Sequence, residues 1–105
     1  MIISDDELYS IFKMIKAHVK DVQIDVLERN MISAQRELIA VEAQAHRKKN
    51  TSIIKTMHTI NIKLIEVKNS YSKIQNNLNK ETCNEIEAWI QSCENRRQNL
   101  AKKKF

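Results

Sequence analysis

The amino-acid sequence predicts an all-α protein, and three observations carry that prediction. The chain has 105 residues and contains no glycine and no proline, the residues on which most tight turns and strand corners depend. Its apolar side chains recur at alternating spacings of four and three, the period of one helix face. Helix-capping patterns stand before two of these stretches. We therefore expect a single domain over residues 1–105, built as a long helical hairpin or antiparallel coiled coil with a third C-terminal helix, in an elongated bundle of three or four helices.

The first helix is expected over about residues 5–48. Ser4 and Glu7 form a capping box, in which the hydroxyl of the first residue accepts the N–H of the second. The apolar residues that follow lie on two stripes, rotated relative to each other by about 100° of helix. Either one helix changes its packing partners between Val26 and Asn30, or the chain breaks at Asn30. We favour a continuous helix, because no residue in this region is a strong helix breaker.

Two further helices are expected after the first. The turn between the first and second lies at residues 47–52, where basic residues suit a helix C-terminus and an asparagine suits the left-handed cap. The second helix then spans about residues 52–79. After a run rich in asparagine, Thr82 and Glu85 form another capping box, so the third helix is expected over about residues 82–103.

The most regular apolar stripe belongs to the second helix, and we expect it to pack against part of the first as an internal seam. The residues of this internal seam are Leu38, Val41, Ile53, Met57, Ile60, Leu64, Val67, Tyr71, Ile74 and Leu78. The other stripe of the first helix faces elsewhere, and either the third helix or another chain covers it. With the single tryptophan it forms the expected partner-binding set: Leu8, Phe12, Ile15, Val19, Val22, Val26 and Trp89. Because a thin three-helix rod cannot cover all this apolar surface, we predict association with a protein partner or with itself, as a dimer.

The net charge of +5 is unevenly distributed along the chain. Residues 1–50 carry eight basic and eight acidic side chains, whereas residues 51–105 carry ten and five. The candidate phosphate contacts are the basic residues near the end of the chain: Arg96, Arg97, Lys102, Lys103 and Lys104. A basic helix end also complements the helix dipole and keeps the surface hydrated, and we weight that interpretation above nucleic-acid binding.

The sequence predicts neither catalysis nor a cofactor. Without glycine the chain has no phosphate-binding loop, dinucleotide fingerprint or nucleophile elbow. It has no Glu-x-x-His pattern and no closely spaced Cys and His residues, which helical metal sites need. Cys83 and Cys93 would lie about 15 Å apart on one helix, too far for a disulfide, so we expect free thiols in a reducing cytoplasm. No apolar run is long enough to span a membrane, and the acidic start of the chain does not resemble a secretory signal.

The function expected from these patterns is that of a small helical interaction protein: an adaptor, assembly factor or chaperone-like subunit that associates through its helices. One alternative is a basic helical regulator that binds nucleic acid through the C-terminal cluster. Another is a phage or mobile-element inhibitor that covers the surface of a host protein. The sequence does not separate this inhibitor from the small helical interaction protein, because both act by covering a surface.

Overall fold

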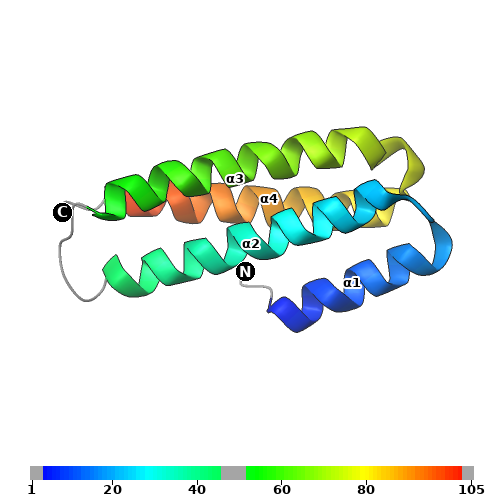
Figure 1. Ribbon diagram of the computed structural model, residues 1–105, viewed down its shortest axis with the longest axis horizontal. Helices are drawn as coiled ribbons and strands as arrows, with labels where there is room; N and C mark the ends of the chain where they lie inside the picture. The colour runs from blue at the N-terminus through cyan, green and yellow to red at the C-terminus, as the bar shows by residue number, and fades with distance from the viewer. Residues whose placement is uncertain (1–3, 46–51, 103–105) are drawn as a thin grey trace.

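The computed structural model describes residues 4–45 and 52–102, which fold as a four-helix bundle (Figure 1). In these two segments the chain forms four α-helices and no strand. The helices are α1 (Asp5–His18), α2 (Val22–Ala45), α3 (Ser52–Ile74) and α4 (Lys80–Lys102), and one 3-10 turn, η1 (Gln75–Asn77), precedes α4. The bundle measures 45 × 22 × 19 Å. The predicted elongated all-α bundle is therefore confirmed.

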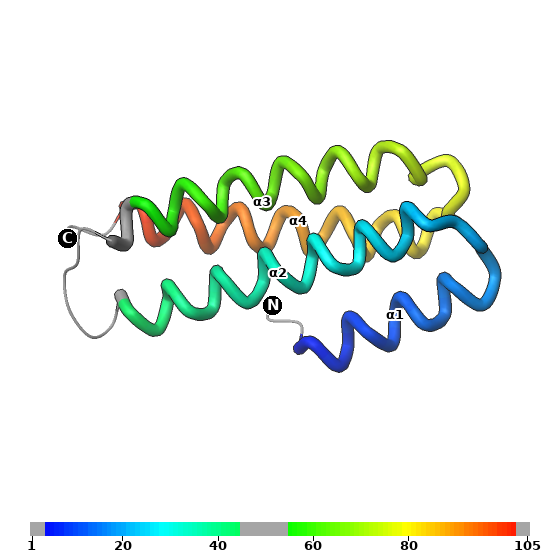
Figure 2. The backbone as a smooth tube through the Cα atoms, viewed as in Figure 1, coloured from blue at the N-terminus to red at the C-terminus, as the bar shows by residue number. Residues whose placement is uncertain are grey.

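Each helix runs antiparallel to the one before it, so the bundle has up-down-up-down topology (Figures 1 and 2). α2, α3 and α4 have 23 or 24 residues each, whereas α1 has 14. At a rise of 1.5 Å per residue the long helices extend about 35 Å and α1 about 21 Å. α1 therefore lies beside only the half of α2 nearest their connection, as Figure 2 shows.

The first helix expected over residues 5–48 is in fact two helices, and this prediction was wrong. The chain leaves α1 at Val19, which is extended (φ −127°, ψ 119°), and its N–H donates to the carbonyl oxygen of Ile15 at 2.9 Å. Asp21 then caps α2, because its Oδ1 accepts the N–H of Gln23 at 2.9 Å. With these end groups satisfied, the chain reverses and lays the apolar side of α1 over the core.

The chain stays helical through Asn30, where a break was the alternative. The side-chain amide of Asn30 donates a hydrogen bond to Ser70 Oγ at 2.9 Å. Ser70 is buried on α3, so this asparagine connects two helices instead of ending one. A second polar contact across the same helix pair runs from Lys63 Nζ to Ser33 Oγ at 2.6 Å.

The ends of the other helices agree only partly with the expected capping boxes. Ser4 Oγ accepts the N–H of Glu7 at 3.2 Å, as the sequence predicts. α4, however, begins two residues earlier than expected, because Asn79 Oδ1 accepts the N–H of Thr82 at 2.8 Å and thus caps the helix. The expected turn at residues 47–52 lies outside the described residues except for Ser52, the first residue of α3.

One apolar core runs through the bundle, and every helix contributes to it. α1 supplies three of its residues, while the long helices supply the rest. The buried apolar residues are Leu8, Phe12, Ile15, Ile24, Leu27, Met31, Ile32, Ala34, Leu38, Val41, Ile60, Leu64, Val67, Tyr71, Ile74, Ile86, Trp89, Ile90, Cys93 and Leu100. Burying such side chains stabilises the fold by roughly 1.5–3 kcal/mol each before the entropy cost of folding.

Candidate functional site

Most residues expected to bind a partner lie inside the protein's own core. Leu8, Phe12, Ile15 and Trp89 are buried, and Val19 and Val26 are half-buried. Val22 is the one exposed member of the set, with 68% of its surface accessible. The prediction failed for the buried residues because α1 folds back on the bundle, so α2 and α4 cover the stripe that one straight helix would have left open.

The residues of the expected internal seam lie where α3 meets the other helices. Leu38, Val41, Ile60, Leu64, Val67, Tyr71 and Ile74 are buried, while Met57 and Leu78 are half-buried and pack against the core. The side chain of Ile53 lies outside the described residues. The seam is therefore mainly an α2–α3 contact, and most of its described residues are covered by the chain's own helices.

The apolar surface that seemed too large for one chain is smaller than expected. Ile24 and Ile32, which fall outside the regular stripes, are buried. Ile39, Ile62 and Ile65 keep between 43% and 48% of their surface exposed. The argument for association assumed a rod of three helices, whereas the chain divides the first of them and folds α1 back onto the core.

The basic cluster is not a free set of phosphate contacts. Arg96 forms a two-pronged ion pair with Glu42 on α2, in which Nε lies 3.0 Å from Oε2 and Nη2 contacts Oε1. This hydrogen-bonded carboxylate raises the pKa of the Arg96 guanidinium. Arg97 is half-buried, and Lys102 is exposed at the end of α4. Lys103 and Lys104 lie outside the described residues. Arg96, expected as a phosphate contact, instead joins α4 to α2 through its ion pair with Glu42.

A chain of polar contacts fixes the start of α1 against the rest of the bundle. Gln35 of α2 is 1% exposed, and its Nε2 donates to Asp5 Oδ1 at 3.0 Å. Its Oε1 accepts the indole N–H of Trp89 at 2.8 Å. Arg36 Nε donates to the other oxygen of Asp5 at 3.0 Å. α1, α2 and α4 are thereby held in one register at the level of Gln35.

A groove lies between α1 and α4, and we call it the α1–α4 groove. Its main part is a cavity of about 800 Å³, continued towards the α1–α2 connection by a second hollow of about 420 Å³. Ile11, Glu81 and Glu85 line both parts. The other residues that line the groove are Asp6, Glu7, Ser10, Met14, Ile15, His18, Val19, Asn77, Leu78, Asn79, Thr82, Asn84 and Ala88. The groove therefore follows α1 along most of its length.

The groove has an apolar floor and acidic rims. Ile11 is half-buried at its base, Met14 is 70% exposed beside it, and Ala88 is exposed on the α4 side. Four exposed carboxylates stand on the rims: Asp6, Glu7, Glu81 and Glu85. The lining includes no lysine or arginine. The local charge is thus negative on a chain whose net charge is +5.

The carboxylates of the groove differ from several others in the chain in having no ion-pair partner among the described residues. Among the described residues, none of the four takes part in an ion pair, and the only side-chain partner recorded for them is the hydroxyl of Ser4 at Glu7. Five carboxylates elsewhere do pair with the chain's own cations: Asp5, Asp25, Glu28, Glu42 and Glu94. The groove thus brings together four exposed acidic side chains that take part in no ion pair among the described residues.

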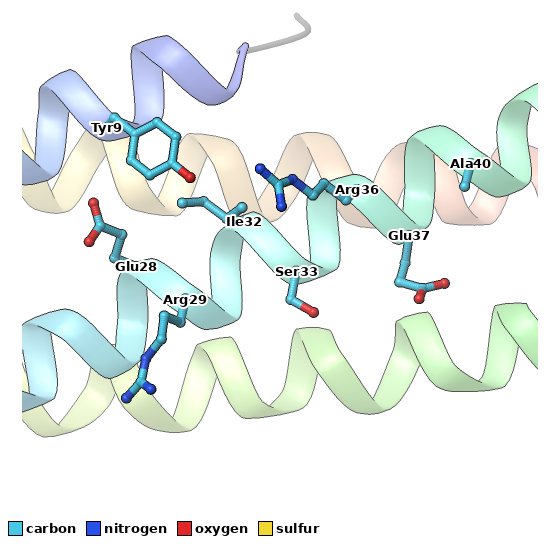
Figure 3. A pocket seen from close by; sticks show the side chains of 8 residues that line it. All are labelled: Tyr9, Glu28, Arg29, Ile32, Ser33, Arg36, Glu37 and Ala40. Atoms are coloured by element: carbon cyan, nitrogen blue, oxygen red, sulfur yellow. The ribbon is translucent and has the colours of Figure 1, made fainter.

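Another hollow, of about 500 Å³, lies over α2 beside the N-terminal part of α1 (Figure 3). Tyr9 of α1 lies over one end, near Glu28 and Ile32. Figure 3 shows that Arg29 extends towards α3, whereas Arg36 lies on the side of α1. Because the two guanidinium groups point apart and Arg36 is paired with Asp5, this hollow does not assemble a cation pair around an anion.

Two side chains with ionisable groups, those of Cys93 and Tyr71, are buried in the core. Cys93 is 1% exposed, and burial raises the pKa of its thiol to about 11. Tyr71 donates its hydroxyl proton to Glu87 Oε2 at 2.5 Å, and burial together with this hydrogen bond raises the pKa of the phenol. Cys83 and Cys93 are both free thiols. Within residues 4–45 and 52–102, no three His, Cys, Asp or Glu side chains come close enough to hold a metal ion.

Comparisons with known proteins yield no relative for this chain. No family model matches it, and neither the characterised proteins nor the solved structures contain a significant match. Across the described helices, none is long and apolar enough to cross a membrane. The geometry of the bundle is therefore the basis for any functional proposal.

Sequence reasoning missed the α1–α4 groove, although part of its signal is visible in the sequence. On α1 the residues Glu7, Ser10, Ile11 and Met14 follow the spacing of one helix face, and on α4 so do Glu81, Asn84, Glu85 and Ala88. Each of these faces carries acidic residues beside small or apolar ones. That the two faces meet depends on the return of α1 at Val19, which no local pattern reveals.

Proposed function

We propose that this chain is a small protein-interaction module, acting as an adaptor, assembly factor or chaperone-like subunit through the α1–α4 groove. The observation that carries the proposal is the groove itself, a hollow of about 800 Å³ between two helices whose exposed faces include Ile11 and Ala88. A helix of another protein would complete this part of the bundle, as helix-in-groove recognition does elsewhere. The α1 face involved lies next to the stripe that the sequence suggested, and it remains accessible.

The groove is long enough for a partner helix, since its lining extends from Asp6 to Val19 of the chain. α1 extends about 21 Å, so a partner helix of about four turns would run along its whole length. Helices pack with their axes about 8–10 Å apart, and small side chains such as Ala88 and Ser10 permit such close approach. Met14 adds a flexible apolar side chain that can adapt to the partner.

The experiment is site-specific photo-crosslinking with a photoreactive residue at Asn84, an exposed position that lines the groove, compared with the same residue at Glu66 on the exposed side of α3. We expect position 84 to form one saturable protein adduct that excess wild-type protein displaces and the Ala88→Gln variant does not. The proposal is overturned if position 84 forms no saturable adduct, or if position 66 forms the same adduct equally well.

A further inference from the structure

We propose that the partner segment for the α1–α4 groove is an amphipathic helix with lysine or arginine on both flanks of an apolar stripe. This inference rests on the proposed function and names the chemistry of the partner. The apolar stripe would lie over Ile11 and Ala88, and the basic flanks would lie along the carboxylates of the two rims. Three steps lead to this assignment.

The first step is the placement of the carboxylates on opposite walls. Asp6 and Glu7 come from α1, and Glu81 and Glu85 come from α4. A helix lying between these walls would therefore meet negative charge on both sides of its buried stripe. Basic residues on one flank alone would leave the carboxylates of the other wall unpaired, so their placement favours a helix with two basic flanks.

The second step is the electrostatic cost that the empty groove carries. Glu81 and Glu85 are four residues apart on α4, and like charges at this spacing repel each other and destabilise a helix. Their side chains have no basic partner in the described part of the chain. A partner cation would relieve this repulsion, and a partner anion would increase it. Complementary charge of this kind sets specificity and the association rate.

The third step is the contrast between the negative charge of the groove and the positive net charge of the whole chain. The net charge of +5 repels a basic ligand from most of the surface. A basic helix would thus be attracted at the groove and repelled around it, which favours one docking position. Phosphate-bearing partners such as nucleic acids would face the opposite pattern and avoid the groove.

The test measures binding of a fluorescently labelled model peptide to the full chain. The peptide is an end-blocked amphipathic helix of about twenty residues, with leucine on its apolar stripe and lysine on both flanks; its matched control carries glutamate at the lysine positions. We expect only the lysine peptide to bind, with an affinity that falls as salt is raised because the rim charges are exposed. Equal binding of the two peptides, or no binding of either, would overturn the proposal.

Variants on the rims and on the floor localise the site. We expect Glu81→Lys/Glu85→Lys to weaken binding about tenfold or more, mostly through slower association. Glu37→Lys/Glu66→Lys makes the same change of net charge away from the groove and should alter binding by less than about twofold. Ala88→Gln should block the floor without a charge change, whereas Ala101→Gln on the same helix should not. Because all of these positions except the half-buried Glu37 are exposed, circular dichroism and thermal melting should confirm intact folding.

Other occupants give distinct results. If sedimentation equilibrium reveals a dimer that Ala88→Gln dissociates, the groove belongs to a second copy of this chain and the basic-helix proposal is wrong. If a DNA or RNA duplex displaces the lysine peptide from the protein itself, the assignment is also wrong. If a protein is crosslinked at position 84 but its capture is unaffected by Glu81→Lys/Glu85→Lys, the proposed function stands and the charge inference falls.

Discussion

The indole N–H of Trp89 donates a hydrogen bond to Oε1 of Gln35 at 2.8 Å, and both residues are almost fully buried. The contact joins α4 to α2 over 54 positions of sequence. The same glutamine amide binds Asp5 at the start of α1. A polar side chain in an apolar core must have its donors and acceptors satisfied, and here the two partners that satisfy it come from two other helices.

We predict that Gln35→Met destabilises the protein by about 1–3 kcal/mol, because it leaves the buried indole N–H of Trp89 without an acceptor. Methionine has a similar volume, so the loss reports the hydrogen bonds more than the packing. Urea unfolding followed by the fluorescence of this single tryptophan measures the effect. Gln98→Met, at an exposed position of α4, is the control and should change little. An unchanged unfolding free energy for Gln35→Met would mean that the hydrogen bonds of Gln35 to Trp89 and Asp5 do not stabilise the fold.

A double-mutant cycle should detect the ion pair between Arg96 and Glu42. The two side chains keep 14% and 29% of their surface exposed, and the two-pronged geometry favours a strong contact. We expect a coupling energy of about 1–2 kcal/mol from Arg96→Met, Glu42→Gln and the double variant. The same cycle on the exposed pair of Lys16 and Asp25 should give less than about 1 kcal/mol. Equal coupling in both pairs would contradict the structural difference between them.

Stability should fall at alkaline pH through Cys93. Burial raises the pKa of its thiol to about 11, whereas in the unfolded chain a cysteine ionises near pH 8.5, roughly. Between these values the unfolded state releases a proton that the folded state keeps, so the unfolding free energy decreases as pH rises. We expect the stability advantage of wild type over Cys93→Ala to shrink by about 2 kcal/mol between neutral pH and pH 10.5.

The control for this pH dependence is Leu100→Ala, which removes a buried side chain from the same helix without removing a titratable group. Its destabilisation should be the same at both pH values. Thiol labelling of native protein at mildly alkaline pH provides a second readout, since we expect the half-buried Cys83 to react well before Cys93. If Cys93 reacts first, its thiol is not buried as described.

The break between α1 and α2 should tolerate added residues, unlike the interior of α2. We predict that a Gly-Ser insertion after Lys20 lowers the unfolding free energy by less than about 1 kcal/mol, because it only lengthens an existing connection. The same insertion after Asn30 rotates the rest of α2 relative to its buried face. That variant should lose its cooperative unfolding transition in circular dichroism. Similar effects at the two sites would indicate one continuous helix over both.

Local patterns predicted much of the helical structure. The capping interaction of Ser4 with Glu7 and the regular stripe of α3 follow from spacing alone, because helix caps and helix faces depend on residues three or four positions apart. The same reasoning failed at Thr82, where the neighbouring Asn79 offers an equally suitable cap one turn earlier. It also failed at Val19–Asp21, because this short connection contains neither glycine nor proline to indicate the end of a helix.

The candidate site could not be predicted in the same way. Periodicity identified Leu8, Phe12 and Ile15 as one apolar face, but it did not say whether this chain or another covers it. The adjacent face with Ile11 has fewer apolar residues, and its role depends on Glu81 and Glu85 lying opposite. These pairs are about 70 positions or more apart in the sequence, beyond the range of any helical repeat.

The sequence by itself determined that the chain is helical, which side of each helix is apolar, and that the phosphate-binding loops built on glycine are missing. The tertiary structure decided that the expected first helix is divided, that its apolar stripe is covered from within, and that an acidic groove opens between α1 and α4. The physical reason is the range of the interactions. Backbone hydrogen bonds and side-chain spacing act over one or two turns, whereas the placement of α1 opposite α4 depends on contacts that form only when distant segments meet.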